Sequence, residues 1–256
     1  MNKNRYRVIF NTVRGMLMVV PDIAKSGRAG SARASGLSHM LSSLTGRVGA
    51  LCFSLWLAMG VIQPASAAIV ADAQAPGGQR PTIINSASGT PQINIQTPSA
   101  GGVSRNTYSQ FDVGKRGAIL NNSHKNVQTE LGGMVSGNPW LARGEAKVIL
   151  NEVNSRNPSR LNGFVEVAGQ KAQVVIANPS GITCNGCGFI NASRGTLTTG
   201  QAQLNNGNLT GFNVERGEVV VEGAGMDSSR QDYTDIIARS VKVNACLLYT
   251  SPSPRD

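Results

Sequence analysis

The stretch VIANPSGITCNGCGFINASRGTLTTG, residues 175–200, decides the fold class of this 256-residue chain. An apolar run ends at Asn178-Pro179-Ser180-Gly181, and a second turn, Asn185-Gly186, lies between two cysteines. Proline presets φ to about −65° at the second position of a turn, and glycine releases the chain into the next strand. Short apolar runs that end in tight turns indicate an all-β fold.

The rest of the chain continues this alternation of short strands and turns. Its 30 glycines and 5% aromatic residues favour turns and short strands over a helical bundle. Residues 68–91 are expected to form an irregular lead-in, and residues 230–239 are the one weak helical candidate. Strand-like runs occur at residues 92–96, 118–120, 146–153, 164–167, 173–177, 195–199 and 218–222.

A Gly-Phe pair recurs along the chain, with its phenylalanine at Phe164, Phe189 and Phe212. A repeat of roughly 25 residues is typical of a parallel β-solenoid, in which equivalent side chains of successive coils stack. The spacing therefore predicts an internal phenylalanine ladder, with glycine at each coil corner. The alternative is a β-sandwich in which the three pairs coincide by chance. Frequent asparagine favours the solenoid, because asparagine tolerates left-handed turns.

Residues 1–67 have the features of an export leader. Residues 48–62 form an uncharged apolar run, which is shorter than the roughly 20 residues of a membrane-spanning helix. Small residues at Ala65 and Ala67 predict signal-peptidase cleavage before Ala68.

The formal net charge of +10 is concentrated in this leader. The first 47 residues hold eight basic residues against the single acid Asp22, which leaves about +3 for the rest of the chain. A nucleic-acid-binding surface needs clustered Lys and Arg, so no nucleic-acid partner is expected.

The cysteines predict a local disulfide. Cys184 and Cys187 are the only pair between the leader and the C-terminal tail. A zinc site needs about four ligands, and His124 is the only histidine in that region, so no metal site or cofactor is expected. A thioredoxin-like pair belongs at the start of a helix, whereas Asn185-Gly186 forms a turn. In an oxidising compartment the pair should close a disulfide that fixes this turn.

The tail CLLYTSPSPRD, residues 246–256, looks like translated sequencing adapter and is excluded from the interpretation. We therefore expect the natural protein to continue beyond residue 245, with any effector downstream.

Several motifs resemble known secretion elements. Residues 1–26 resemble the extended signal peptide region of very large Gram-negative exoproteins. Asn178-Pro179-Ser180-Gly181-Ile182 resembles the Asn-Pro-Asn-Gly-Ile centre of the two-partner-secretion, or haemagglutination-activity, domain of filamentous haemagglutinin and contact-dependent-inhibition exoproteins. Asn138-Pro139-Trp140-Leu141 resembles its companion Asn-Pro-Asn-Leu motif. Further similar segments lie at residues 108–113, 150–153, 157–161 and 235–239.

This resemblance implies a right-handed parallel β-helix with small capping antiparallel sheets over residues 68–245. It implies export by the Sec translocon, cleavage by signal peptidase, and recognition by a cognate Omp85-type outer-membrane transporter through its POTRA domains. The two Asn-Pro motifs either contact that transporter or only shape the fold. The product would be secreted or bound to the surface of a Gram-negative cell, and a C-terminal passenger would reach host or neighbouring cells. That passenger would be an adhesin, a haemolysin or a growth-inhibition toxin.

An enzyme of the β-helical polysaccharide-lyase type is the competing hypothesis. Such a site needs clustered acids, with a basic residue near the sugar. The acids here are scattered, and the nearest group, Asp227, Asp232 and Asp235, is expected in a loop. No catalytic residue is therefore assigned.

The intact mass of protein recovered from the periplasm tests the leader and the disulfide together. We expect a chain that begins at Ala68 and weighs two hydrogens less than the dithiol form of Cys184 and Cys187. A retained leader would contradict secretion, and thiols that alkylate under oxidising conditions would contradict the disulfide.

Overall fold

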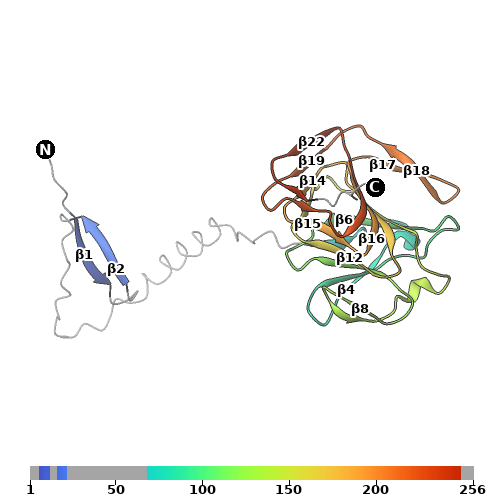
Figure 1. Ribbon diagram of the computed structural model, residues 1–256, viewed down its shortest axis with the longest axis horizontal. Coiled ribbons are helices and arrows are strands. Elements are labelled where there is room, and N and C mark those ends of the chain that lie inside the picture. Colours follow the sequence, from blue (N-terminus) through green and yellow to red (C-terminus); the bar gives the residue numbers. More distant parts are fainter. Residues whose placement is uncertain (1–5, 12–15, 22–67, 249–256) are drawn as a thin grey trace, which may run out of the picture. The chain divides into compact units, whose positions relative to one another are not determined.

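The computed structural model describes residues 6–11, 16–21 and 68–248 and divides the chain into two units. In the first unit, β1 (Tyr6–Asn11) pairs antiparallel with β2 (Met16–Pro21). The second unit contains the remaining strands (Figure 1). The apolar run 48–62, Ala65 and Ala67 lie outside the described residues. Among the helices of the described residues, none is long and apolar enough to cross a membrane.

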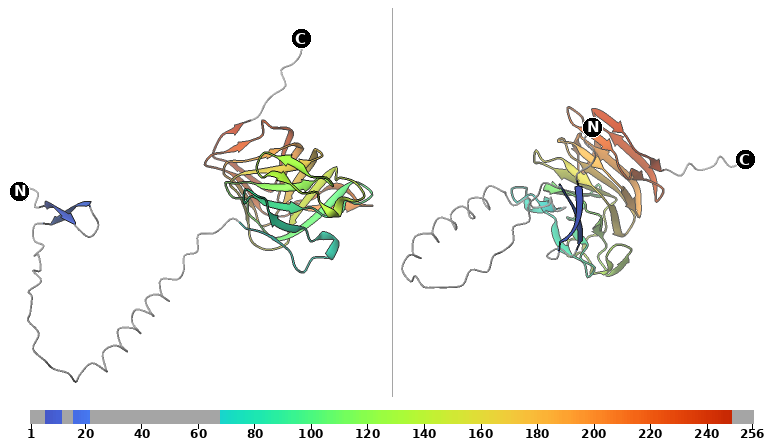
Figure 2. Two further views of the ribbon diagram at one scale, coloured as in Figure 1. Left: turned by 90° about the horizontal axis from the view of Figure 1, so that it is seen from below. Right: turned by 90° about the vertical axis from the view of Figure 1, so that its left-hand side faces the viewer.

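The second unit is a β-helix (Figure 2). From β10 onward its chain visits three parallel sheets in the same order in each coil. The first sheet contains β6 (Val103–Phe111), β10 (Val148–Val153), β13 (Ala172–Ala177), β16 (Ala192–Thr198) and β21 (Gln231–Ile237). The second contains β11 (Ser159–Leu161), β14 (Ile182–Cys184), β19 (Glu218–Val221) and β22 (Ser240–Val243). The third contains β5 (Pro91–Asn94), β7 (Ala118–Asn122), β12 (Phe164–Gly169), β15 (Cys187–Ile190), β20 (Met226–Asp227) and β23 (Leu247–Leu248).

Stacked side chains fill the interior of this helix. Ile149 aligns with Val174, and Val174 aligns with Gly195, so one coil takes 25 residues and the next 21. The interior residues form one continuous apolar cluster that includes the fully buried rings of Tyr108 and Phe111. The fold predicted above, a right-handed parallel β-helix with small antiparallel caps, is confirmed.

Two antiparallel strands close the N-terminal end of the stack. β3 (Ile69–Ala71) pairs with β6, and β4 (Thr82–Asn85) pairs with β5. A 3-10 turn, Gly77–Gln79, connects them. The irregular lead-in expected for residues 68–91 is therefore wrong in part, because the first strands of the helix would otherwise leave a row of backbone groups unpaired.

Two inserted hairpins cover outer faces of the helix. β8 (Val127–Thr129) and β9 (Gly133–Val135) lie on the third sheet, and β17 (Gln201–Asn205) and β18 (Asn208–Asn213) lie on the first. Figure 1 shows the second of these projecting beside the coils. Its tip residues Asn206 and Gly207 have φ of 50° and 76°, as a two-residue Asn-Gly hairpin turn requires.

The helix expected at residues 230–239 is instead strand β21. It pairs in parallel with β16 over its whole length, and this pairing overrides a weak local preference. Asp232 and Asp235 therefore lie on a strand, and Asp227 lies on β20, rather than in the expected loop. They bond outward, Asp232 to Lys171 and Asp235 to Arg194.

The phenylalanine ladder is also wrong, although the repeat length is close to the observed coils. Phe164 lies opposite Gly188, and Phe189 lies opposite Val165, so the two rings are one residue out of register. Because strand side chains alternate, Phe189 points into the core and Phe164 points outward. A Cβ at Gly188 would lie 2.5 Å from the Phe164 ring, so this glycine gives room to the ring rather than forming a corner. Phe212 lies on β18, outside the coils.

Candidate functional site

Asn178 occupies the turn between β13 and β14 and is fully buried. Its side-chain oxygen accepts a hydrogen bond from the Ser180 N–H at 2.9 Å. Its amide donates to the Asn157 carbonyl at 2.9 Å and to Ser159 Oγ at 3.0 Å, both in the preceding coil. The side chain thus caps its own turn and joins it to the neighbouring one.

Asn138 repeats this arrangement at the start of a 3-10 turn, Pro139–Leu141. Its side-chain oxygen accepts from the Trp140 N–H at 3.0 Å. Its amide donates to the carbonyls of Ile95 and Asn121, each at 2.9 Å. Both Asn-Pro motifs therefore use a buried asparagine as an internal hydrogen-bond connector.

Within the Asn138 motif, Trp140 is the large side chain that faces solvent. It is 45% exposed, whereas Leu141 is buried in the core. The Trp140 carbonyl accepts from Thr97 Oγ1 at 2.7 Å, and its indole N–H lies 3.3 Å from Thr82 Oγ1. The buried asparagine and these contacts hold an apolar ring at a fixed place on the surface.

Beside the Asn178 turn, the surface is hollowed by a polar cavity of about 130 Å³. Pro179 lines it on one side and Gln201, at the start of the β17–β18 hairpin, on the other. Glu152 and Arg216 contribute opposite charges. On the surface, the two motifs therefore present Pro139, Trp140 and this cavity, since both asparagine side chains are enclosed.

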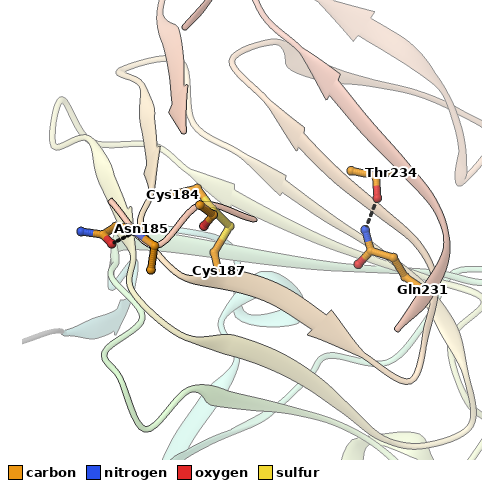
Figure 3. The surroundings of a disulfide bond; sticks show 7 residues. Cys184, Asn185, Cys187, Gln231 and Thr234 are labelled. Carbon is orange, nitrogen blue, oxygen red and sulfur yellow. Dashed lines mark hydrogen bonds between the residues drawn. A yellow bond between two sulfur atoms is a disulfide. The ribbon is translucent and has the colours of Figure 1, made fainter. Parts of the chain in front are cut away.

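Cys184 and Cys187 are bonded to each other at the corner between β14 and β15, with both side chains in the core (Figure 3). Asn185 between them accepts a hydrogen bond from the Ala224 N–H at 2.9 Å, and the Gly186 N–H donates to the Gly225 carbonyl at 2.7 Å. The corner is a strand–turn–strand, and it is tied to the next coil.

The C-terminal end of the stack is apolar. Val241 and Val243 align with the buried Val219 and Val221, so they point toward the helix axis. They are nevertheless 44% and 47% exposed, because no described strand lies beyond β22.

Several carboxylates of the β-helix are engaged in structural contacts. Glu166 accepts from the N–H groups of Glu130 and Leu131, each at 2.8 Å. The hydrogen bond with His124 lowers the pKa of Glu145. Burial raises the pKa of Tyr108, whose hydroxyl stays a donor to Asn151. In the described part of the chain, no three His, Cys, Asp or Glu side chains converge on a possible metal site.

Comparison with known families identifies this fold and its motifs. The model of the TPS secretion domain matches residues 67–248. The chain belongs to the TPS secretion domain family. The model of the extended signal peptide of the type V secretion system matches residues 1–51.

Relatives and a solved structure agree with this assignment. The chain is 68% identical over 246 residues to "Toxin CdiA" of Yersinia pestis and 47% identical over 251 residues to "tRNA nuclease CdiA-2" of Burkholderia pseudomallei. Each match covers 96% of this chain but only 8% of the relative, so the chain spans about a twelfth of their length. The crystal structure of the filamentous hemagglutinin secretion domain superposes with a TM-score of 0.66 at 36% identity, and covers 73% of this chain and 60% of that one.

The TPS domain is thus a secretion module, exported from a Gram-negative cell for secretion or display at the cell surface. The sequence motifs located both buried asparagines. They did not indicate that Trp140 is exposed or that a cavity adjoins Pro179, because those depend on the packing of distant segments. The adapter origin of residues 246–256 stays a prediction. The family match reaches residue 248, and β23, which contains residues 247 and 248, pairs with β20.

Replacing Asn178 by alanine tests whether this side chain holds the TPS fold. The change leaves the Ser180 N–H and the Asn157 carbonyl without their partner, at a cost of about 1–3 kcal/mol in the free energy of unfolding. Urea denaturation of the mature protein measures this. Ser180→Ala is the matched control. It removes a single hydrogen bond, to the Ser155 carbonyl, and should lower the free energy of unfolding by less. Equal stability of Asn178→Ala and the parent would contradict a structural role.

Proposed function

We propose that this TPS domain is recognised in the periplasm by the POTRA domains of a cognate Omp85-type transporter. We further propose that its open end templates the folding of the coils that follow. The first step selects the exoprotein for the outer membrane, and the second gives the emerging chain a folded edge on which to pair.

The observation that carries templating is the difference between the two ends. At the N-terminal end, β3 and β4 pair antiparallel with the first strands and close the stack. At the other end, the inward-pointing Val241 and Val243 are half-exposed. Unpaired strand edges with exposed apolar residues accept a further strand readily, so the next coil is their natural occupant.

Recognition by the transporter is best supported at Trp140. Exposed tryptophans that are held rigidly are frequent anchors of protein interfaces, and the cavity beside Pro179 adds polar groups for orientation. An extended segment that adds to the edge of a POTRA sheet would supply sequence-tolerant backbone hydrogen bonds. Nothing in this role requires catalysis or nucleic acid.

The parent exoprotein is proposed to be a contact-dependent growth-inhibition toxin that acts on neighbouring cells. High identity to proteins named toxin CdiA and tRNA nuclease CdiA supports this, although their names describe much longer chains. An adhesin is the second candidate, because the filamentous hemagglutinin secretion domain has the same fold. A haemolysin or a polysaccharide-active enzyme has no comparable support.

Trp140→Ala tests transporter recognition. We expect binding to the isolated periplasmic domains of the cognate transporter to weaken about tenfold or more, while the domain stays folded, because the ring is 45% exposed and lies outside the core. Val70→Ala removes a side chain of similar exposure, 46%, outside both motifs and is the control. Equal affinity of Trp140→Ala and the parent in a titration would rule out this site.

Val241→Lys tests templating in the full-length exoprotein. The side chain is exposed in the TPS domain but would be buried beneath the next coil, where an unpaired charge is costly. We expect the isolated domain to fold normally, while the downstream coils of the secreted protein become sensitive to protease. Lys242→Ala, which changes the residue next to Val241, is the control. Unchanged protease resistance of the downstream coils would count against templating.

A further inference from the structure

The β17–β18 hairpin reaches back along the helix to a segment far earlier in the chain. It leaves the coil after β16, and its tip lies on the turn that precedes β6. Ser99 Oγ in that turn donates to the Gly207 carbonyl at 2.6 Å, across a sequence separation of 108 residues. The hairpin thus contacts coils that together contain more than half of the residues of the folded unit.

The underside of the hairpin covers an apolar strip on the outer face of the first sheet. The strip consists of one or two residues from each of β6, β10 and β13, namely Val103, Leu150, Val175 and Ala177. Ala202, Leu209 and Phe212 of the hairpin pack on it. Strands β6, β10, β13 and β16 pair directly with one another, and their ladder uses no hydrogen bond from the hairpin.

We propose that this hairpin is a clasp that docks after the coils have stacked and commits the domain to its folded state. Every residue of the strip precedes the hairpin in the chain, so the coils can pair before the clasp is available. Once the coils have stacked, docking orders only the hairpin itself, and its few contacts with the strip must offset that loss of entropy. With the clasp open, the apolar strip is uncovered and the stack is easier to open.

This inference rests on the proposed function, in which the clasp would be open when the transporter receives the domain and closed after release. A late clasp separates those two conditions. Exposed residues on β17, such as Gln201, Gln203 and Asn205, make no comparable apolar contact, so the docking strength depends on few side chains.

A glycine at the tip contact allows the clasp to be opened by one substitution. A Cβ at Gly101 would lie 2.4 Å from Asn208 Oδ1 and 2.6 Å from the Gly207 carbonyl, both on the hairpin. The φ of Gly101 is not in the left-handed region, so alanine there disturbs the docked tip rather than the local backbone.

Native-state hydrogen exchange of the mature protein tests the clasp through Gly101→Ala. In the parent we expect the amides of β17 and β18 to exchange faster than those of β10 and β13, because the hairpin opens before the stack. Gly101→Ala should accelerate both groups about tenfold, because it destabilises the docked state from which every opening starts. Gly78→Ala, where a Cβ meets nothing within 4 Å, and Gly211→Ala, within the hairpin itself, are the matched controls. Ser99→Ala, which removes the tip hydrogen bond, should act in the same direction as Gly101→Ala.

Two results would overturn the clasp. If the amides of β17 and β18 are protected as strongly as those of β10 and β13 in the parent, the hairpin is an inseparable part of the stack. If no amide changes its exchange rate, the tip contact contributes nothing to stability.

Affinity for the periplasmic domains of the transporter is measured on the same variant. If the hairpin is such a clasp, Gly101→Ala binds the transporter domains at least as tightly as the parent does. If the proposed function is wrong, the parent protein itself does not bind them.

Discussion

Parallel pairing between successive coils is the constraint on which the rest of this structure depends. Each strand offers its backbone donors and acceptors to the strand one coil later, as Ile149 does to Val174. Such a stack is satisfied everywhere except at its two ends. The N-terminal end is closed by antiparallel strands β3 and β4, whereas the last coil leaves Val241 and Val243 half-exposed. The two ends of the described stack therefore differ in how their last strands are covered.

Buried asparagines supply hydrogen bonds at the corners, where the chain leaves a strand. At a corner the ladder is interrupted, and the turn must find other partners. Asn138 and Asn178 each cap their own turn and donate to two groups in neighbouring segments. In the proposed function, folding and recognition share one motif, because the asparagine that holds the Asn138 turn also fixes the exposed ring of Trp140.

The outer faces of the three sheets differ in how they are covered. Two faces carry apolar residues and are covered by inserted hairpins, β8–β9 on the third sheet and β17–β18 on the first. The second sheet points Arg160, Thr183, Val220 and Lys242 outward, and no hairpin of the described residues lies over it. Because β17 and β18 contact segments a hundred residues earlier, the stability of the early coils depends on a late part of the chain.

The sequence by itself determined the all-β class, several of the strands and turns, and a repeat close to the 25-residue coil, since Asn-Pro-Ser-Gly, Asn-Gly and the Cys184–Cys187 spacing act within a few residues. It also located the buried asparagines through their motifs. Only the tertiary structure decided which residues lie opposite one another. Phe164 and Phe189 share a repeat but differ by one residue in register, and residues 230–239 form a strand because β16 offers an edge to pair with. Register, strand pairing and the exposure of Trp140 depend on contacts between distant segments, and a local pattern cannot contain them.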